Sequence, residues 1–325
     1  MDAMNFDKYY IGYSLDAEIR YKASSGGVGT AIIQYLLSLP DFDTAISFDF
    51  SQKDCMFIPK IIHAAEEVNV CGSIYHDIDL IRFVKNNIGN IVGGIVVVCA
   101  PCQVSPIRSI LNKHKIKNFI ISYCCSGQTT IEGTWKYYEL LGVKKENVAY
   151  MQYRGNGWPS GIQIWLKNGQ VLSKPNWTEP WITLHQSCLF TPAKCLMCVR
   201  DTGRDADVSL ADPWLPNYID KEKKGCTLFL TCSDFGNKIV HEMREKKVIS
   251  FVNSSYEEYL IAQKPNVEKE MRLKRYKSLR KAMVRRNKNR FYHGLFTSNL
   301  FFLKLHNKLL RFRYKIYDWF YKGNV

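Results

Sequence analysis

Several features that would place this chain in a familiar class are missing. No uninterrupted apolar run approaches the roughly 18 to 20 residues that a membrane-spanning helix needs. Residues 1–8 show no basic region followed by an apolar run, so no secretory signal is predicted. The chain has no internal repeat and no low-complexity segment, and its 46% hydrophobic and 13% aromatic content argues against disorder. We therefore expect a cytoplasmic protein whose cysteines stay reduced.

Common catalytic signatures are also absent. The seven histidines are scattered and none forms a ligand pair, so the sequence does not support a Ser/His/Asp triad. It contains neither a G-x-G-x-x-G fingerprint nor a P-loop. The nearest substitute is Ser24-Ser25-Gly26-Gly27, ahead of a predicted helix. Its glycines and free N–H groups would suit a phosphate of a nucleotide or flavin, although the same residues would also suit a simple helix N-cap.

Cysteine, in contrast, is abundant, with 11 residues that include two C-x-x-C pairs. Cys99-Ala-Pro-Cys102 lies at a predicted strand-to-helix junction and suits a redox dithiol, a metal or iron–sulfur site, or a buried strand end. Cys195-Leu-Met-Cys198, predicted in a loop, is the stronger ligand signal, because its two thiolates can share one metal or cluster. Zinc would suit these four cysteines. A [4Fe–4S] cluster would suit the second pair plus one thiol each from the first and from Cys124-Cys125-Ser-Gly127. Two unligated thiols in a surface loop remain the simplest alternative for the second pair.

An acidic stretch follows the second pair. Asp205, Asp207 and Asp212 could ligate a metal or serve as general acids or bases. For Asp205 we favour a structural role, in a strand over residues 206–210 that an Asp-Pro turn ends. The role of Asp212 stays open.

The expected fold class is α/β (α+β), with a mixed sheet in the amino-terminal region and a more antiparallel, loop-rich region after it. Strands are predicted over 44–50, 59–64, 95–99, 118–123, 147–154 and 162–166, and helices over 27–39, 79–87, 105–114, 131–141, 240–247 and 255–262. Asn168-Gly169 signals a tight hairpin turn. Three regions follow from this pattern, over residues 1–142, 143–263 and 264–325.

All of the net charge lies in the last region. Residues 264–325 contain 18 Lys/Arg and 3 Asp/Glu, whereas residues 1–263 contain 27 of each. The tail is predicted to be helical and, beyond Arg290, amphipathic. Its apolar members are Leu295, Phe296, Phe302, Leu305, Leu309, Phe312, Ile316 and Phe320. A membrane surface or an acidic partner would fit such a helix, nucleic acid is not favoured, and a helical extension packed on the body through this stripe is the alternative.

In their order along the chain, these motifs resemble the coenzyme F420 hydrogenase/dehydrogenase beta-subunit family, whose members are flavin and iron–sulfur proteins. The resemblance covers about residues 10–215. It is carried by Ser24-Ser25-Gly26-Gly27, Cys71-Gly72-Ser73-Ile-Tyr75, Ala100-Pro101-Cys102-Gln103, Cys125-Ser-Gly127, Tyr153-Arg154 with Gly157-Trp158, Cys195-Leu-Met-Cys198, and Ala206-Asp207-Val-Ser-Leu-Ala-Asp212-Pro-Trp214. Cys71 stands where members of the family often carry arginine.

The resemblance implies two cofactors, FAD and a [4Fe–4S] cluster. The residues that it assigns to FAD are Ser24, Ser25, Gly26, Gly27, Thr30, Gly72, Ser73, Tyr75, Pro101 and Gln103. It assigns the cluster to Cys102, Cys125, Cys195 and Cys198, with Cys99, Cys124 and Cys188 as competing positions. Residues 1–142 would then be the flavin-binding region and residues 143–263 the cluster-binding region.

The implied function is a flavin-dependent iron–sulfur oxidoreductase that reduces or oxidises a small molecule. Many bacterial members carry an amino-terminal ferredoxin-like module that this sequence does not contain, so a separate ferredoxin or reductase is the expected electron partner. Members also occur among surface-polysaccharide biosynthesis proteins, which suggests a sugar-linked substrate. The competing hypothesis is a non-catalytic protein with a four-cysteine zinc site. Under either hypothesis, the basic tail leads us to expect that the protein can lie peripherally at the inner face of the membrane.

Overall fold

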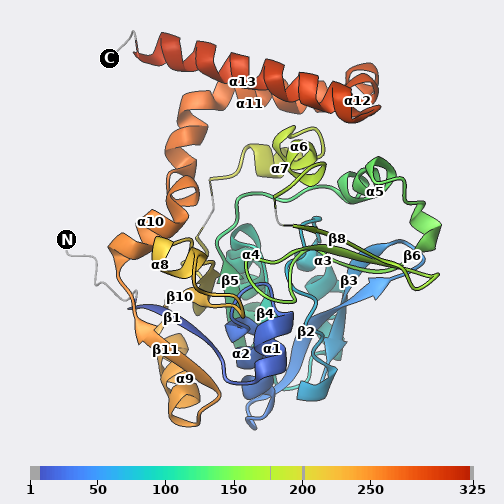
Figure 1. Cartoon of the computed structure of the whole chain (residues 1–325). Coiled ribbons are helices and arrows are strands. Elements are labelled where there is room, and N and C mark those ends of the chain that lie inside the picture. The colour runs from blue at the N-terminus through green and yellow to red at the C-terminus, as the bar shows by residue number, and fades with distance from the viewer. Residues whose placement is uncertain (1–7, 176, 200–201, 323–325) are drawn as a thin grey trace.

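The computed structural model describes residues 8–175, 177–199 and 202–322, with side chains to residue 319. A mixed eight-stranded sheet forms its centre, in the order β11-β1-β10-β9-β5-β4-β2-β3 (Figure 1). The strands are β1 (Lys8–Ser14), β2 (Phe42–Ser51), β3 (Met56–Ile62), β4 (Gly94–Val98), β5 (Asn118–Tyr123), β9 (Val208–Ala211), β10 (Thr227–Thr231) and β11 (Ile249–Asn253). The central strands β2, β4, β5 and β9 pair in parallel, and the outer ones pair antiparallel.

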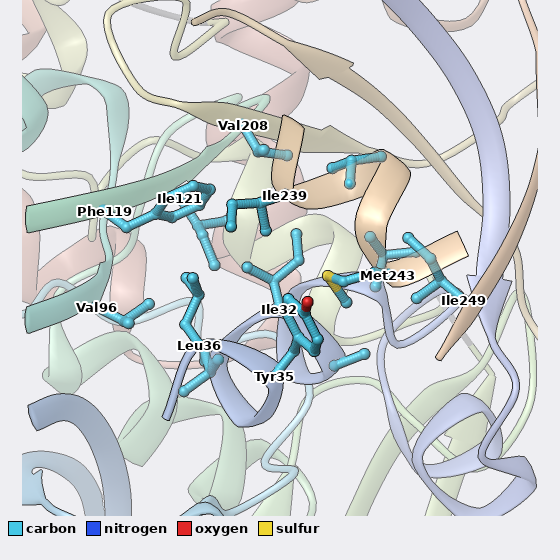
Figure 2. Packing of buried hydrophobic residues seen from close by; sticks show 14 of the residues in the cluster. Ile32, Tyr35, Leu36, Val96, Phe119, Ile121, Val208, Ile239, Met243 and Ile249 are labelled. Carbon is cyan, nitrogen blue, oxygen red and sulfur yellow. The ribbon is translucent and has the colours of Figure 1, made fainter. Parts of the chain in front are cut away.

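Successive apolar side chains of the central strands point to opposite faces of the sheet and so contribute to a hydrophobic core on each face. Val96, Phe119 and Ile121 point toward α2 (Val28–Leu37) and α9 (Asp234–Glu245), where they meet Ile32, Leu36, Ile239 and Met243 (Figure 2). Their neighbours Ile95, Val97 and Ile120 point to the opposite face, which α3 (Leu80–Asn86) and α4 (Pro101–Lys113) cover. The sheet is therefore enclosed on both sides, as parallel strands require.

A smaller antiparallel sheet follows, made of β6 (Val148–Gln152), β7 (Gly161–Leu166) and β8 (Val171–Pro175). The predicted Asn168-Gly169 turn joins β7 to β8, with Gly169 at a φ of 86°. The remaining short elements are α1 (Ala17–Lys22), α5 (Ile131–Leu140), α6 (Trp181–Gln186), α7 (Ala193–Leu196) and α8 (Pro216–Ile219), with 3₁₀ turns η1 (Ala65–Glu67), η2 (Ile88–Asn90) and η3 (Lys145–Asn147).

The carboxyl-terminal region is helical, as predicted. It consists of α10 (Tyr256–Val267), α11 (Lys269–Lys288), α12 (Arg290–Thr297) and α13 (Leu300–Lys322). Figure 1 shows α11 leading away from the large sheet and α13 crossing the outer end of the molecule beyond α6 and α7. Leu279 and Met283 of α11 and Leu310 of α13 form a small core with Leu196 of α7. The tail is thus packed against the body and belongs to the fold.

The packing of α13 differs from the expected stripe. The side chains that contact the body include Leu303, His306, Asn307 and Leu310, all of them buried. Five members of the predicted stripe, Leu295, Leu305, Leu309, Phe312 and Ile316, are exposed instead, and the side chain of Phe320 lies outside the described part. The alternative interpretation, in which the tail packs on the body through this stripe, is therefore wrong for these residues.

The predicted fold class is confirmed, and the predicted strands and helices all occur, most of them with shifts at their ends. Two local expectations change. The helix expected from Ser105 begins at Pro101, since proline suits the first helical position after the extended residue Ala100. Cys195, expected in a loop, lies on the single turn α7.

The large sheet combines strands from two of the three predicted regions. Its strands β9, β10 and β11 come from residues 143–263 and pair with strands from residues 1–142. The division of the chain into three regions stays a prediction. No helix in the described part of the chain is long and apolar enough to cross a membrane.

Candidate functional site

A cavity of about 370 Å³ opens where the parallel strands β4, β5 and β9 end. The carboxyl ends of parallel strands are the usual place for ligands in α/β proteins. Most of the residues assigned to FAD by resemblance line this cavity. They are Ser24, Ser25, Gly27, Thr30, Gly72, Ser73, Tyr75 and Gln103. Gly26 and Pro101 adjoin lining residues in sequence without lining the cavity themselves.

The loop before α2 is fixed by hydrogen bonds to Thr227 of β10. The Thr227 hydroxyl accepts a hydrogen bond from the Gly26 amide at 2.8 Å and lies 3.0 Å from the Ser25 hydroxyl. Gly27 is the N-cap of α2 with a φ of 76°, and no side chain caps the helix. The simple N-cap interpretation of the serines is therefore wrong. The first amides of α2 have no side-chain partner, which is the arrangement that favours an anionic ligand.

Gly72 lets two chain segments meet at the cavity wall. Its φ is 68°, and a Cβ atom there would lie 1.9 Å from the carbonyl oxygen of Arg154. Only glycine fits both the left-handed backbone and this approach. The segment that begins at Cys71 is therefore fixed directly against β6 and the residues that follow it.

Arg154 and Asp212 form a bidentate ion pair at the cavity. The guanidinium donates at 2.6 and 2.9 Å to the two carboxylate oxygens and at 2.7 Å to the Ser24 carbonyl. Burial, the largest single influence, lowers the pKa of Arg154, but the Asp212 carboxylate and Tyr75 together raise this pKa above its usual value. Trp158 donates its indole N–H to Asp212 at 3.0 Å. The role that the sequence left open for Asp212 is thus visible in the structure: its carboxylate pairs with the charged guanidinium of Arg154.

Tyr75, Trp177 and His185 line another part of the cavity, and Trp181 lies behind Tyr75 in the core. Tyr75 stacks on Trp181 with ring centroids 5.8 Å apart, and Trp177 lies edge-on to His185 at 4.9 Å. Burial lowers the pKa of His185 to about 4, so this imidazole is neutral at ordinary pH. A planar heterocycle would find flat, neutral partners here.

The four cysteines assigned to the cluster influence one another electrostatically. Burial raises the pKa of Cys102, and the Cys198 thiolate raises it further. Burial raises the pKa of Cys125 to about 11, with smaller increases from Cys195 and Cys102. The pKa of Cys195 is raised first by burial and also by Cys102 and Cys198. Thiols from three separate segments of the chain, at the start of α4, after β5 and on and after α7, therefore lie near one another.

Tyr123 joins this group to the cavity. It ends β5, lines the cavity, and lies close enough to the cysteines that their thiolates raise its pKa, after burial, well above the usual value. Cys125 lines the cavity as well. Of the four thiols assigned to the cluster, Cys125 thus shares the cavity with most of the predicted flavin residues.

The spacing of these thiols bears on what they could hold. Among the described residues, no three His, Cys, Asp or Glu side chains lie close enough to hold a single metal ion. A four-iron cluster is larger than one ion, so its cysteine ligands stand farther apart than those of zinc. Four thiols from three segments of the chain fit the donor chemistry of such a cluster.

Of the competing cysteines, Cys99 and Cys124 line the same cavity, whereas Cys188 does not. Cys99 packs in the core beneath α3 and α4 with 1% exposure, and burial raises its pKa to about 12. Cys124 contacts the Tyr259 hydroxyl at 3.0 Å, and Cys188 belongs to the core between α7 and α11. Cys71 is buried, and burial raises its pKa to about 12. The burial of Cys99 in the hydrophobic core favours a structural role for it over a ligand role.

Two positive side chains adjoin the thiols. The Lys269 ammonium, at the start of α11, donates to the carbonyl of Cys125 at 2.9 Å and lowers the pKa of that thiol against the effect of burial. Lys194 has the same lowering effect on Cys102 and Cys195. Positive charge beside thiolates favours the deprotonated form that binds iron.

The acidic stretch before Asp212 is structural. Asp205 is exposed and accepts from the Ser105 hydroxyl at 3.2 Å. Asp207 is buried and links neighbouring elements, because it accepts from the Ile120 amide at 2.8 Å and from Ser233. Sequence reasoning did not single out Lys269, Tyr123 or His185. A lysine, a tyrosine or a histidine in isolation carries no spacing signal that would have revealed them.

Two family profiles match the chain. "Coenzyme F420 hydrogenase/dehydrogenase, beta subunit N-term" matches residues 9–85, and the companion profile for the carboxyl terminus of the same beta subunit matches residues 92–256. No curated protein matches the chain.

One similar solved structure is entitled "Xenon derivatization of the F420-reducing [NiFe] hydrogenase complex from Methanosarcina barkeri". The matching chain is 17% identical with a TM-score of 0.61, and the alignment covers 82% of this chain and 90% of that one. At this identity the likeness shows a shared fold and nothing finer.

Proposed function

Since this chain belongs to the coenzyme F420 hydrogenase/dehydrogenase beta-subunit family, a family of redox proteins, we propose that it is a flavin-dependent iron–sulfur oxidoreductase. In this proposal FAD binds in the cavity at the carboxyl ends of β4, β5 and β9. A [4Fe–4S] cluster binds Cys102, Cys125, Cys195 and Cys198. The observation that supports it best is the convergence of these four thiols beside a cavity that most of the flavin candidates line.

The chemistry of such a pair of cofactors suits the residues present. A flavin beside an iron–sulfur cluster exchanges the single electrons of the cluster for the two-electron hydride step of the flavin. The protein then needs to bind the cofactors, orient them and enclose the reacting groups, and it does not need to supply a general acid and a general base. The uncapped amides of α2 would face a phosphate group, and the aromatic side chains of Tyr75 and Trp177 would enclose a ring system.

Arg154 is the residue that we assign to ligand binding in the cavity. Its guanidinium stays charged because Asp212 pairs with it, and its Nε atom is buried with no hydrogen-bond partner in the described structure. A buried donor without a partner is costly, so a ligand atom or a water at this point would be stabilising. An anionic or carbonyl oxygen of the bound molecule fits that position.

The electron partner and the substrate belong to the same proposal. We take a separate ferredoxin or reductase as the electron partner and a small, sugar-linked molecule as the substrate. Both follow from family-level resemblance. The peripheral membrane position expected from the tail depends on the outer face of α13 and not on this cavity.

Spectroscopy of protein purified without oxygen tests the proposal. We expect flavin bands together with a broad shoulder near roughly 400 nm from the cluster. A colourless protein that holds one zinc ion and no flavin would contradict it and would support the four-cysteine zinc protein instead.

Two cysteine variants test the ligand assignment. Cys195→Ser should remove the cluster absorbance while much of the flavin remains. Cys188→Ser is the matched control, because Cys188 lies on the same segment but packs into the core between α7 and α11. If Cys188→Ser bleaches the cluster and Cys195→Ser does not, the assignment is wrong.

A further inference from the structure

Helix α13 has two faces of different character. On the inner face, the His306 ring lies 3.0 Å from the carbonyl oxygen of Ser187, and the Asn307 amide donates to the carbonyl of Thr183 at 2.9 Å. Leu303 and Leu310 fill the space around these contacts and are buried. The inner face therefore fixes both the position and the rotation of the helix.

The outer face carries a continuous apolar stripe. Phe301 and Phe312 are 70% and 60% exposed, and Leu305, Leu309 and Ile316 lie between or beyond them with exposures of 37%, 38% and 37%. Steps of three and four residues place all five on one side of a helix. The stripe spans roughly 22 Å along the axis. Figure 1 shows α13 at the outer end of the molecule, so nothing in the described chain covers this side.

The preceding helix extends the same kind of surface. Phe291 of α12 is 82% exposed, and Leu295, one turn later, is 40% exposed. Helix α12 packs directly on α13. Isolated exposed apolar residues are normal on a soluble protein, but five along one face of a helix mark an interaction site.

Positive charge flanks the stripe. Lys304, Lys308, Arg311 and Lys315 are exposed on α13. The acidic residue of this helix, Asp318, is turned toward α11, where it accepts from the Tyr276 hydroxyl at 2.6 Å and pairs with Arg275 at 2.9 Å. The outer surface is thus apolar along its centre and cationic along its edges.

We propose that the outer face of α12 and α13 binds the surface of an anionic phospholipid bilayer. Aromatic and aliphatic side chains would enter the boundary between headgroups and acyl chains, while the flanking lysines and arginines meet phosphate and carboxylate headgroups. A second copy of the chain fits less well, because two such faces would bring their cationic edges together. This inference goes beyond the redox function and does not depend on the cavity or the cysteines.

Co-flotation of the full chain with vesicles tests the proposal. Vesicles of phosphatidylcholine alone are compared with vesicles that also contain phosphatidylglycerol. We expect binding to the anionic vesicles only, weakened by added salt because exposed charges are screened. Phe301→Ser combined with Phe312→Ser should weaken binding by about tenfold or more, since two large apolar side chains no longer leave water.

A matched control comes from the same region of the chain. Ile261 of α10 and Met271 of α11 are each 64% exposed and lie outside the stripe. Ile261→Ser combined with Met271→Ser removes comparable exposed apolar surface and should leave vesicle binding unchanged. Both double variants change exposed residues, so both should fold, which circular dichroism checks.

Three outcomes would overturn the proposal. One is no flotation with anionic vesicles, and another is equal loss of binding in both double variants. The third is that light scattering finds the wild-type chain as a dimer and the Phe301→Ser/Phe312→Ser variant as a monomer, which would make the stripe an interface between copies. The spectra of flavin and cluster are separate readouts, so a failure here leaves the proposed redox function untouched.

Discussion

Replacing Asp212 by asparagine would remove the counter-charge of a guanidinium that is almost fully enclosed. The side chains of Arg154 and Asp212 are 7% and 15% exposed, and the pair makes two short hydrogen bonds. The asparagine keeps the shape and one acceptor but leaves the Arg154 charge without compensation. Breaking a buried pair from one side typically costs about 3–5 kcal/mol, because the remaining charge stays desolvated.

The double variant distinguishes this cause from simple loss of packing. Arg154→Met together with Asp212→Asn removes both charges, and the indole N–H of Trp158 can still donate to the asparagine oxygen. We therefore expect the double variant to be more stable than the Asp212→Asn variant, with a coupling energy of about 2 kcal/mol or more. Urea unfolding of the apoprotein, followed by tryptophan fluorescence, measures all four members of the cycle.

The outcome of the cycle is decisive. If the two single changes add to give the double, Arg154 and Asp212 act independently and the argument from buried charge is refuted. Trp158→Phe is the control for the neighbouring indole, because it removes one hydrogen bond to Asp212 and leaves both charges in place. It should cost less than Asp212→Asn, about 1–2 kcal/mol.

Three further predictions concern single residues. Gly72→Ala should destabilise the fold more than Gly142→Ala. Both glycines have a positive φ, but only at Gly72 would a Cβ atom lie 1.9 Å from a backbone oxygen. The midpoints of urea unfolding compare the two variants. Burial holds the pKa of His185 at about 4, against 6.5 when unfolded, so the unfolded chain takes up a proton first as pH falls. Stability should therefore drop between pH 6.5 and 4 by about 3 kcal/mol, and His185→Phe should remove that part of the pH dependence. Lys269→Met should shorten the lifetime of the cluster in air, because the pKa of Cys125 rises when the nearby ammonium is lost, whereas Lys277→Met on the exposed side of α11 should not.

Local sequence signals predicted the elements that carry their own pattern. The strand over residues 118–123 matches β5, and the helix over 131–141 ends within one residue of α5. In contrast β1, β10 and β11 were not predicted, although they form one side of the sheet. Short strands of this kind are stabilised by partners far away in sequence, and no local periodicity reports those partners.

The candidate site shows the same division. Motifs with fixed spacing, such as Cys195-Leu-Met-Cys198, could be recognised from the chain. The pairing of Arg154 with Asp212 could not, because it depends on the path of β6 and β9 through space rather than on spacing. Tyr123 was likewise predicted only as the end of a strand, and its position among the thiols follows from how three distant segments of the chain meet.

The tail illustrates how one helical region can serve two surfaces. On its inner side it holds the segment that carries the second cysteine pair, because Arg280 donates to the carbonyl of Leu196 at 3.0 Å and Asn287 donates to that of Cys188 at 2.7 Å. Deleting residues 264–325 would therefore expose this segment and also remove Lys269 from Cys125. Loss of vesicle binding after such a deletion could not be attributed to the outer face. Point changes at Phe301 and Phe312 separate the two roles, because they alter only the face that the body does not contact.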